Sequence, residues 1–486
     1  MRLSRLAAVL GAVWLVLLAP GAAYAHGFGE RYDLPVPLGL YIAGAGATVL
    51  FSFVVIGIFA KGVAVGAYPR FNLFRWRLGR ALAHPWLLQA AKTLSVLVFL
   101  LYLAAGLFGT SDSNSNLAPT LTWIIFWVGL AYFSALVGNI WALINPWKVL
   151  FGWVEAAYRR VSGGKALSRH TPYPEGLGMW PAVALFFAFA WVENVYPDSA
   201  VPFNLAMLAL AYTAVTFGGM FWYGRDTWLR HGEAFSVAFG FLSAFAPTEV
   251  RVRRTPGSAG GPVLRATGRY QRGEIVVDRE QGREPQPGLV DDYEAYAQAP
   301  GEHREWNVRP WGAGLLSAPT PSMSGAVFLL LMLSTVTFDG FAETPFWLSI
   351  WTSLYNGLVG VFGLETSMVI KTTALAAFPL VFLGAFALTA RLMALGRAEM
   401  DTMSVMRAFV YSLLPIALAY HVGHYFSFLL IQGQRIIPLA SDPLGLGWDL
   451  LGTADYAINI AIVDAGAAWI VNVAAIVIGH IVAVYV

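Results

Sequence analysis

The chain has 486 residues, of which 57% are hydrophobic and only 12% are charged, and its mean hydropathy is +0.61. Soluble proteins carry about 25% charged residues, so this composition excludes a soluble globular enzyme and indicates a multi-pass membrane protein whose partner is the lipid bilayer. The absence of cysteine excludes disulfides and thiolate metal sites, and a net charge of +3 without a basic tract gives no reason to expect nucleic acid.

Residues 1–25 have the pattern of a secretory signal peptide. Arg2 and Arg5 precede an apolar run that is too short to span a bilayer comfortably, and Ala23-Tyr24-Ala25 fits a cleavage site. We therefore expect the mature chain to begin at His26, outside the cytoplasm. An uncleaved membrane anchor is the alternative interpretation.

Apolar segments of about twenty residues, the length that crosses a bilayer as a helix, recur along the rest of the chain. We predict an all-α polytopic transmembrane helix bundle of about nine spans. The predicted spans are 38–60, 86–108, 121–144, 178–196, 203–223, 323–341, 368–390, 408–431 and 466–486. Because the last span reaches Val486 without a polar flank, we expect further residues beyond it.

These spans divide into an N-terminal membrane half (26–247) and a C-terminal membrane half (321–486), separated by a charged cytoplasmic linker (248–320). Alternating residues at Tyr270–Val277 predict a small hairpin within that linker. The stretch Glu233–Phe245 is apolar but too short to span, which predicts an interfacial or re-entrant helix. Residues 342–366 are rich in aromatic side chains and predict a helix on the outer surface, where a partner subunit could bind.

Basic residues are distributed asymmetrically among the loops. The loops after the first and third spans carry Lys and Arg, whereas loops 109–120, 197–202 and 342–367 carry none. Because cytoplasmic loops are enriched in Lys and Arg, this pattern predicts a protein of the bacterial cytoplasmic membrane with its mature N-terminus outside, in agreement with the signal peptide.

Histidines inside the predicted spans are the sharpest functional signal. His421 and His424 are three residues apart, so they share one face of a helix, and His480 lies in the last span. Together they could bind a divalent transition metal, copper or zinc, through neutral imidazole. A proton relay, haem ligation and simple hydrogen bonding between helices are the alternatives, with haem less favoured than a metal ion.

His26 is a further candidate metal ligand, because cleavage after Ala25 would give it a free α-amino group beside its imidazole. That chelating pair suits Cu(II). His26 could join the other histidines only through a cavity that opens outward. The alternative is that cleavage leaves a histidine at this position by accident.

Carboxyl groups at the predicted outer ends of the spans are candidate general bases. Asp339 ends the sixth span near Lys371, with which a buried ion pair is plausible, and Asp464 begins the last apolar run. A carboxylate beside a metal-bound water can accept its proton. The alternative is that these carboxylates are solvated or cap helices.

Several segments resemble a family of bacterial membrane proteins labelled fenitrothion hydrolase. The similar segments are His26–Pro35, Gly232–Val237, Thr335–Gly340 and the tract His421–Gly447, which are spread along nearly the whole chain. The resemblance implies an exported, membrane-bound protein linked by name to the hydrolysis of organophosphate-type esters. It carries over no catalytic residue.

The leading hypothesis from the sequence is a metal-dependent membrane hydrolase of such esters. In it, His421, His424 and His480 hold a metal that lowers the pKa of bound water, and Asp464 or Asp339 accepts the proton. One alternative is a transporter, or a copper- or proton-handling protein, whose substrate is a small molecule or a metal ion. The other is a non-catalytic anchor subunit that binds a partner at its outer face.

Overall fold

The computed structural model describes residues 46, 68–252, 268–271, 274–277, 304–395 and 401–486. Eight helical segments in this part of the chain are long and apolar enough to cross a membrane. They are Pro85–Phe108, Leu117–Leu136, Glu175–Asn194, Pro202–Tyr223, Met323–Ala342, Pro345–Ala394, Thr402–Ser441 and Ala465–Tyr485. The protein is therefore an all-α, multi-pass membrane bundle, as the sequence predicted.

Each of these eight segments overlaps one predicted span. The remaining predicted span, 38–60, lies outside the described residues except for Gly46, and so do the signal peptide and His26. The helices of the N-terminal half are α3 (Arg77–Leu82), α4 (Pro85–Phe108), α5 (Leu117–Pro119), α6 (Leu130–Leu136), α7 (Trp141–Ile144), α8 (Pro146–Val161), α9 (Trp180–Asn194), α10 (Pro202–Tyr223), α11 (Arg225–His231) and α12 (Ala234–Ser243). A π-helical segment, η2 (Thr120–Gly129), joins α5 to α6.

The C-terminal half begins after the last strand. Its helices are α14 (Ala313–Ser317), α15 (Met323–Ala342), α16 (Pro345–Phe362), α17 (Thr366–Ala394), α18 (Thr402–Phe409), α19 (Leu413–Gln432), α20 (Ile436–Ser441) and α21 (Ala465–Tyr485). Short 3-10 turns occur in both halves: η1 (Leu73–Arg75), η3 (Glu175–Leu177), η5 (Gly363–Glu365), η6 (Val410–Ser412), η7 (Gly433–Arg435) and η8 (Ile460–Ile462).

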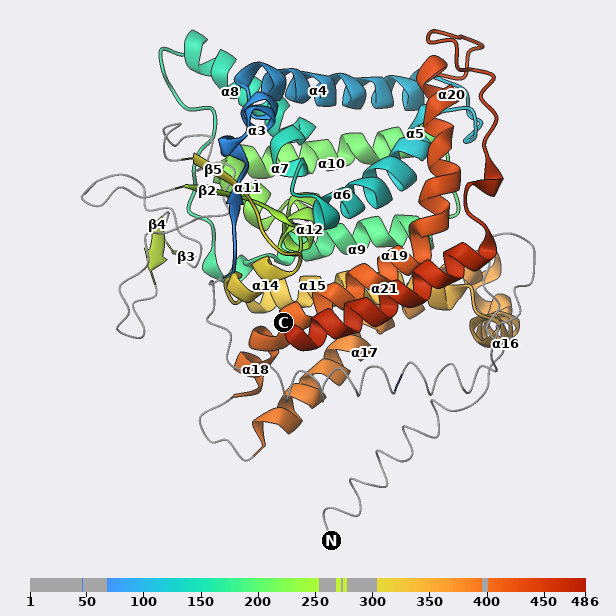
Figure 1. Ribbon diagram of the computed structural model, residues 1–486. Helices are drawn as coiled ribbons and strands as arrows, with labels where there is room; N and C mark the ends of the chain where they lie inside the picture. Colours follow the sequence, from blue (N-terminus) through green and yellow to red (C-terminus); the bar gives the residue numbers. More distant parts are fainter. Residues whose placement is uncertain (1–45, 47–67, 253–267, 272–273, 278–303, 396–400) are drawn as a thin grey trace.

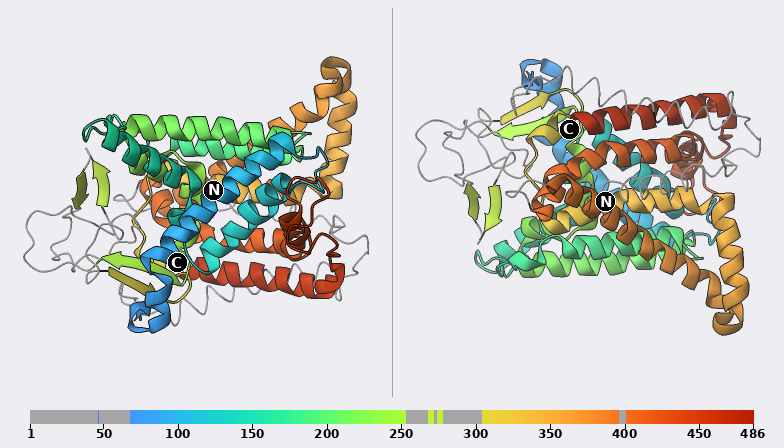
Figure 2. Two further views of the ribbon diagram at one scale, coloured as in Figure 1. Left: turned by 90° about the horizontal axis from the view of Figure 1, so that it is seen from above. Right: turned by 90° about the horizontal axis from the view of Figure 1, so that it is seen from below.

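The long helices lie side by side, and the bundle has two distinct ends (Figure 1). One end, here called the sheet end, carries α3, α8, α11 and the small sheet. The opposite end, here called the α16 end, carries α16 and α20. Figure 2 shows α16 lying across the ends of the long helices. This matches the aromatic helix predicted at 342–366, and Trp347 of α16 packs against Phe338 and Phe341 of α15.

Strands at the two ends of the predicted linker pair with each other and with a strand of the N-terminal half. An antiparallel sheet has the order β1 (Phe71–Asn72), β5 (Arg304–Val308), β2 (Thr248–Val252). Thr248 pairs with Val308, and Val252 pairs with Arg304. The predicted hairpin is present as β3 (Gly268–Gln271) and β4 (Glu274–Val277). Residues at both ends of 248–320 are therefore part of the fold.

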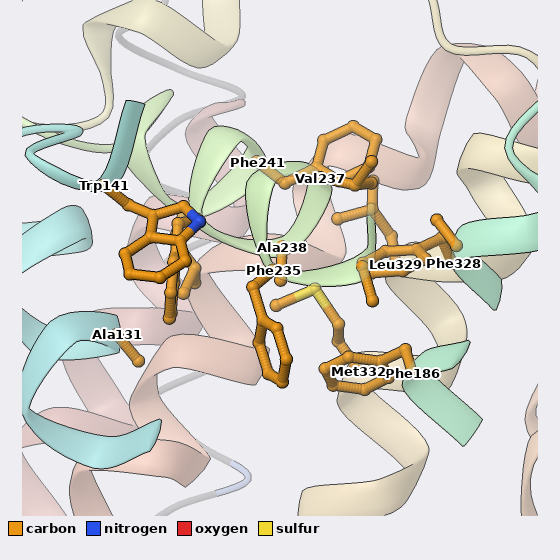
Figure 3. Close-up of a cluster of buried hydrophobic side chains, with 14 of the residues drawn as sticks. Ala131, Trp141, Phe186, Phe235, Val237, Ala238, Phe241, Phe328, Leu329 and Met332 are labelled. Atoms are coloured by element: carbon orange, nitrogen blue, oxygen red, sulfur yellow. The ribbon is translucent and has the colours of Figure 1, made fainter. Parts of the chain in front are cut away.

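Both membrane halves contribute to a single hydrophobic core. Its buried members include Trp127 and Phe186 from the first half, and Phe328 and Leu414 from the second. Helix α12 lies in the middle of this core: Figure 3 shows its side chains pointing toward residues of several surrounding helices. Seven of its ten residues are buried, so the interfacial interpretation of Glu233–Phe245 was wrong. Helix α11, which precedes α12, and strand β2, which follows it, both lie at the sheet end (Figure 1).

Charged side chains hold both ends of α12. The Glu233 carboxylate caps its N-terminus by accepting hydrogen bonds from the backbone N–H groups of Phe235 (2.9 Å) and Ser236 (2.8 Å). At the other end, the Arg309 guanidinium donates to the carbonyl of Ala246 (3.1 Å) and to the Glu249 carboxylate (2.8 Å). A negative group at a helix N-terminus and a positive group at its C-terminus both favour the helix dipole.

Small residues bring two pairs of helices into close contact. A side chain on Gly479 of α21 would meet Ala419 of α19 and would lie 2.8 Å from the Pro415 carbonyl oxygen. A side chain on Gly106 of α4 would likewise lie 2.6 Å from the Ala206 side chain of α10. Small residues at such positions let the backbones of membrane helices approach each other.

Candidate functional site

A cluster of four hydrogen-bonded polar side chains lies inside the bundle, and here it is called the four-residue cluster. Its members come from three helices: Glu193 from α9, Asp339 from α15, and His424 and Tyr425 from α19. Glu193 is the second-last residue of α9, and Asp339 is three residues from the end of α15. The cluster therefore lies about one helical turn inside the α16 end of the bundle.

The Tyr425 hydroxyl joins the two carboxyl groups of the cluster. Its oxygen lies 2.6 Å from Oδ2 of Asp339 and 3.1 Å from Oε1 of Glu193. The same Asp339 oxygen lies 2.8 Å from Nε2 of His424. A tyrosine hydroxyl has a single proton to donate. It can donate to only one of the two carboxyl groups. Its contact with the other is a hydrogen bond only if that carboxyl group is protonated and donates to the hydroxyl oxygen.

The members of the cluster differ in exposure. The side chains of His424 and Asp339 are 30% and 25% exposed, whereas Tyr425 is buried at 8%. His424 and Asp339 therefore form the more exposed part of the cluster, and Tyr425 lies on the side of the bundle interior.

His421 lies one helical turn deeper than Tyr425, among aromatic rings. Its ring is 5.5 Å from Trp127, 5.3 Å from Tyr132 and 4.9 Å from Tyr425, measured between ring centroids. Both of its ring nitrogens are buried without a hydrogen-bond partner among the described residues. The predicted pairing of His421 and His424 on one helical face is present, but only His424 contacts a carboxylate.

His480 does not join the other two histidines. Helix α21 packs against the face of α19 that contains Pro415 and Ala419. At about 100° per residue, His421 and His424 lie on the opposite face of α19. His480 Nδ1 instead lies 2.7 Å from the Ile476 carbonyl oxygen of its own helix. The predicted three-histidine metal site is therefore not assembled by this packing.

The predicted general bases have different surroundings. Asp339 belongs to the four-residue cluster, where its partner is His424 and not the expected Lys371. Asp464 caps the N-terminus of α21 by accepting a hydrogen bond from the Ala467 N–H (2.7 Å). Across the described ranges, no group of three or more His, Asp or Glu side chains is arranged to hold a metal ion.

A second buried carboxyl group, Glu233, was not singled out as a site residue from the sequence. Besides its two backbone donors, it accepts hydrogen bonds from the Tyr212 hydroxyl (2.5 Å) and the Asn145 amide (3.3 Å). The available signal was an ionisable residue at the start of a short apolar stretch. Four donors satisfy this carboxylate, so its role is to hold α12 in place.

Comparison of the chain with family models, with curated proteins and with solved structures finds no match.

Proposed function

We propose that this protein is a proton-handling protein of the bacterial cytoplasmic membrane and that the four-residue cluster is its proton-binding site. The observation that carries the proposal is the Tyr425 hydroxyl placed between two carboxyl groups. One hydroxyl proton cannot serve both carboxyl groups, so the complete network contains one additional, exchangeable proton. Ionisable groups at membrane depth are costly and usually serve ion or proton pathways.

The contrast with Glu233 supports this assignment. The Glu233 carboxylate has four donors, which compensate the cost of burying its charge. Glu193 shares the single Tyr425 hydroxyl with Asp339. Of Glu193 and Glu233, Glu193 is therefore the one whose surroundings accommodate a proton, with Asp339 and His424 as the charged pair that exchanges it with the exposed side.

The distribution of charge supports an orientation. At the sheet end the described chain carries many basic side chains, among them Arg75, Arg77, Arg80, Arg159, Arg160 and Arg169. The loops at the α16 end carry mainly carboxylates, among them Asp198, Glu365, Asp442, Asp449 and Asp455. By the positive-inside rule the sheet end is cytoplasmic. The four-residue cluster then takes up protons from outside.

Infrared titration of the purified protein tests proton binding. We expect a carboxylic acid C=O stretching band that changes with pH and is lost in Glu193→Gln, with its pH dependence altered in Asp339→Asn and in Tyr425→Phe. Asp464→Asn is the matched control, because it removes a carboxyl group from the same end while asparagine preserves the helix cap. A band that is unchanged in Glu193→Gln and Asp339→Asn would contradict the proposed site.

Proton movement is measured separately in liposomes that contain a pH-sensitive dye. We expect Asp339→Asn to slow proton entry by about 100-fold, the size of effect typical of a lost proton-transfer group. Asp464→Asn should be close to wild type. Equal rates in wild type and Asp339→Asn would show that the cluster does not conduct protons.

A further inference from the structure

Three buried ring nitrogens next to the four-residue cluster lack partners in the part of the chain that the structure describes. They are Nδ1 and Nε2 of His421 and Nε1 of Trp127. These residues are only 6% and 3% exposed. A neutral imidazole presents one N–H donor and one bare nitrogen, and an indole presents one donor. The pair therefore offers two donors and one acceptor, which a buried site normally satisfies.

These nitrogens belong to one location. The two rings are in T-shaped contact, with centroids 5.5 Å apart and an interplanar angle of 80°. The Trp127 indole N–H is also directed toward the Glu193 carboxyl group as a donor, although the two do not reach the geometry of a direct hydrogen bond. Because His421 precedes Tyr425 by one turn of α19, the site continues the four-residue cluster toward the bundle interior.

The aromatic side chains that pack against the two rings make no hydrogen bond to these nitrogens. Phe186 and Phe189 pack against Trp127. Tyr132 contacts the His421 ring, but its hydroxyl lies 3.1 Å from each of the backbone carbonyls of His421 and Val422 and is engaged there. The Glu193 carboxyl group is the polar group toward which the Trp127 N–H is directed.

We propose that one water molecule is bound between His421, Trp127 and Glu193, and that it extends the proton path from Glu193 to His421. A buried water makes about three hydrogen bonds to polar groups that would otherwise lack partners, and the three side chains provide that number. A metal ion does not fit, because the indole N–H is no ligand and His421 offers one bare nitrogen. Direct contact between the rings favours a molecule no larger than water.

The proton transfer in this arrangement is balanced. The Glu193 carboxylic acid gives its proton to the water oxygen, and the water gives one of its own protons to the bare nitrogen of His421. The products are a Glu193 carboxylate, a neutral water and a His421 imidazolium, with Asp339 and His424 as the other charged groups nearby. The transfer step rests on the proposed function, whereas the water site does not.

Solid-state NMR of the full chain in lipid bilayers tests the water site. Protein labelled with 15N in histidine and tryptophan side chains is used, and the transfer of magnetisation from water protons to ring nitrogens is measured. We expect transfer to Trp127 Nε1 and to His421. Trp147 is the matched comparison, because it is equally buried but its Nε1 donates to the Thr213 hydroxyl (2.8 Å), so we expect no transfer there.

Variants of His421 and Trp127 test whether these side chains hold the water. His421→Phe keeps an aromatic ring but removes both nitrogens, and we expect it to abolish transfer to Trp127 Nε1. His421→Gln retains one donor and one acceptor, and we expect it to restore the transfer. If His421→Phe does not fold, Trp127→Phe removes the site from the other side and should abolish transfer to His421.

The outcomes distinguish this inference from the proposed function. No transfer from water to either wild-type ring would overturn the water site, while the infrared band of Glu193 would still stand. Transfer with no titrating Glu193 band would leave the water site in place and overturn the proton path. A proton flux in His421→Phe equal to that of wild type would overturn the relay step alone.

Discussion

Glu233 and Glu193 show how the same side chain serves two purposes inside one bundle. Glu233 is fully buried and receives four hydrogen bonds, which fix the start of α12. Glu193 shares one hydroxyl with Asp339. The hydrogen bonds of Glu233 stabilise the fold around α12, whereas those of Glu193 and Asp339 require an additional proton in the network. Counting donors around each carboxyl group separates the two roles where burial alone does not.

Glu233→Ala should strongly destabilise the protein. The change leaves the Tyr212 hydroxyl, the Asn145 amide and two backbone N–H groups without their acceptor, so we expect a loss of about 3 kcal/mol or more. Glu233→Gln, which retains an acceptor, should cost less. Unfolding in mixed micelles measures both, and Glu175→Ala, at an exposed position, should change stability by no more than about 0.5 kcal/mol. Equal stability of Glu233→Ala and Glu175→Ala would contradict this account.

His231 gives a prediction about pH outside the membrane spans. Burial, followed by the charge of Arg230, lowers the pKa of His231 from 6.5 to about 4, and its ring stacks on Tyr173 at 5.2 Å. The unfolded chain therefore binds more protons between these values, so the contribution of His231 to stability falls as pH decreases from 6.5 to about 4. Thermal unfolding at pH 7 and pH 5 should show a smaller difference in His231→Phe than in wild type. An identical difference in both would refute the assignment.

Individual site residues were only partly predictable. The spacing of His421 and His424 correctly placed both on one face of a helix, because that follows from helix geometry. Their partners depend on how α9, α15 and α21 are rotated about their axes, which is decided by side-chain packing across the whole bundle. Asp339 was therefore identified as a site residue but assigned Lys371 as its partner, and His480 was grouped with histidines that face away from it.

Among the elements, the close pairs of helices depend on glycine. Gly479→Val should separate α21 from α19, because the added side chain collides with Ala419 and the Pro415 carbonyl. Overpacking of this kind costs about 1–3 kcal/mol. Gly384→Val on α17 is the matched control, since nothing lies within 4 Å of its added atom. A loss of stability that is equal in both variants would show that helix propensity, and not packing, is responsible.

The long helices were predictable as elements, whereas α12 was not fully so. Twenty consecutive apolar residues identify a span from composition alone. A ten-residue apolar helix is compatible with the membrane surface, a re-entrant path or a soluble core. Its place became clear only from the contacts of Glu233 and Arg309, which lie in distant parts of the sequence. The π-helical turns of η2, which carry Trp127, also gave no recognisable signal.

For the whole molecule, the distribution of charge predicts which end faces the cytoplasm. The natural sequence has no cysteine, so single cysteines are unambiguous reporters. In intact cells a membrane-impermeant maleimide should label Asp449→Cys at the α16 end and should not label Arg160→Cys at the sheet end. Permeabilised cells should show labelling of both. Labelling of Arg160→Cys alone in intact cells would mean the reverse orientation, with the four-residue cluster near the cytoplasm.

The all-α architecture was predictable because a bilayer permits few structures that satisfy the hydrogen bonds of the backbone. The small sheet at one end was not expected, apart from the hairpin, since its strands come from segments separated by most of the N-terminal half. The described residues of the two membrane halves likewise pack into one shared core.

The pairing of α12 with Arg309 also has a consequence for biosynthesis. Helix α12 leaves the ribosome well before Arg309, on which the carbonyl groups at its C-terminal end depend. The first membrane half therefore cannot reach its final arrangement while it is being inserted. Its completion waits for β5 and the first residues of the second half, so the order of synthesis and the order of assembly differ in this protein.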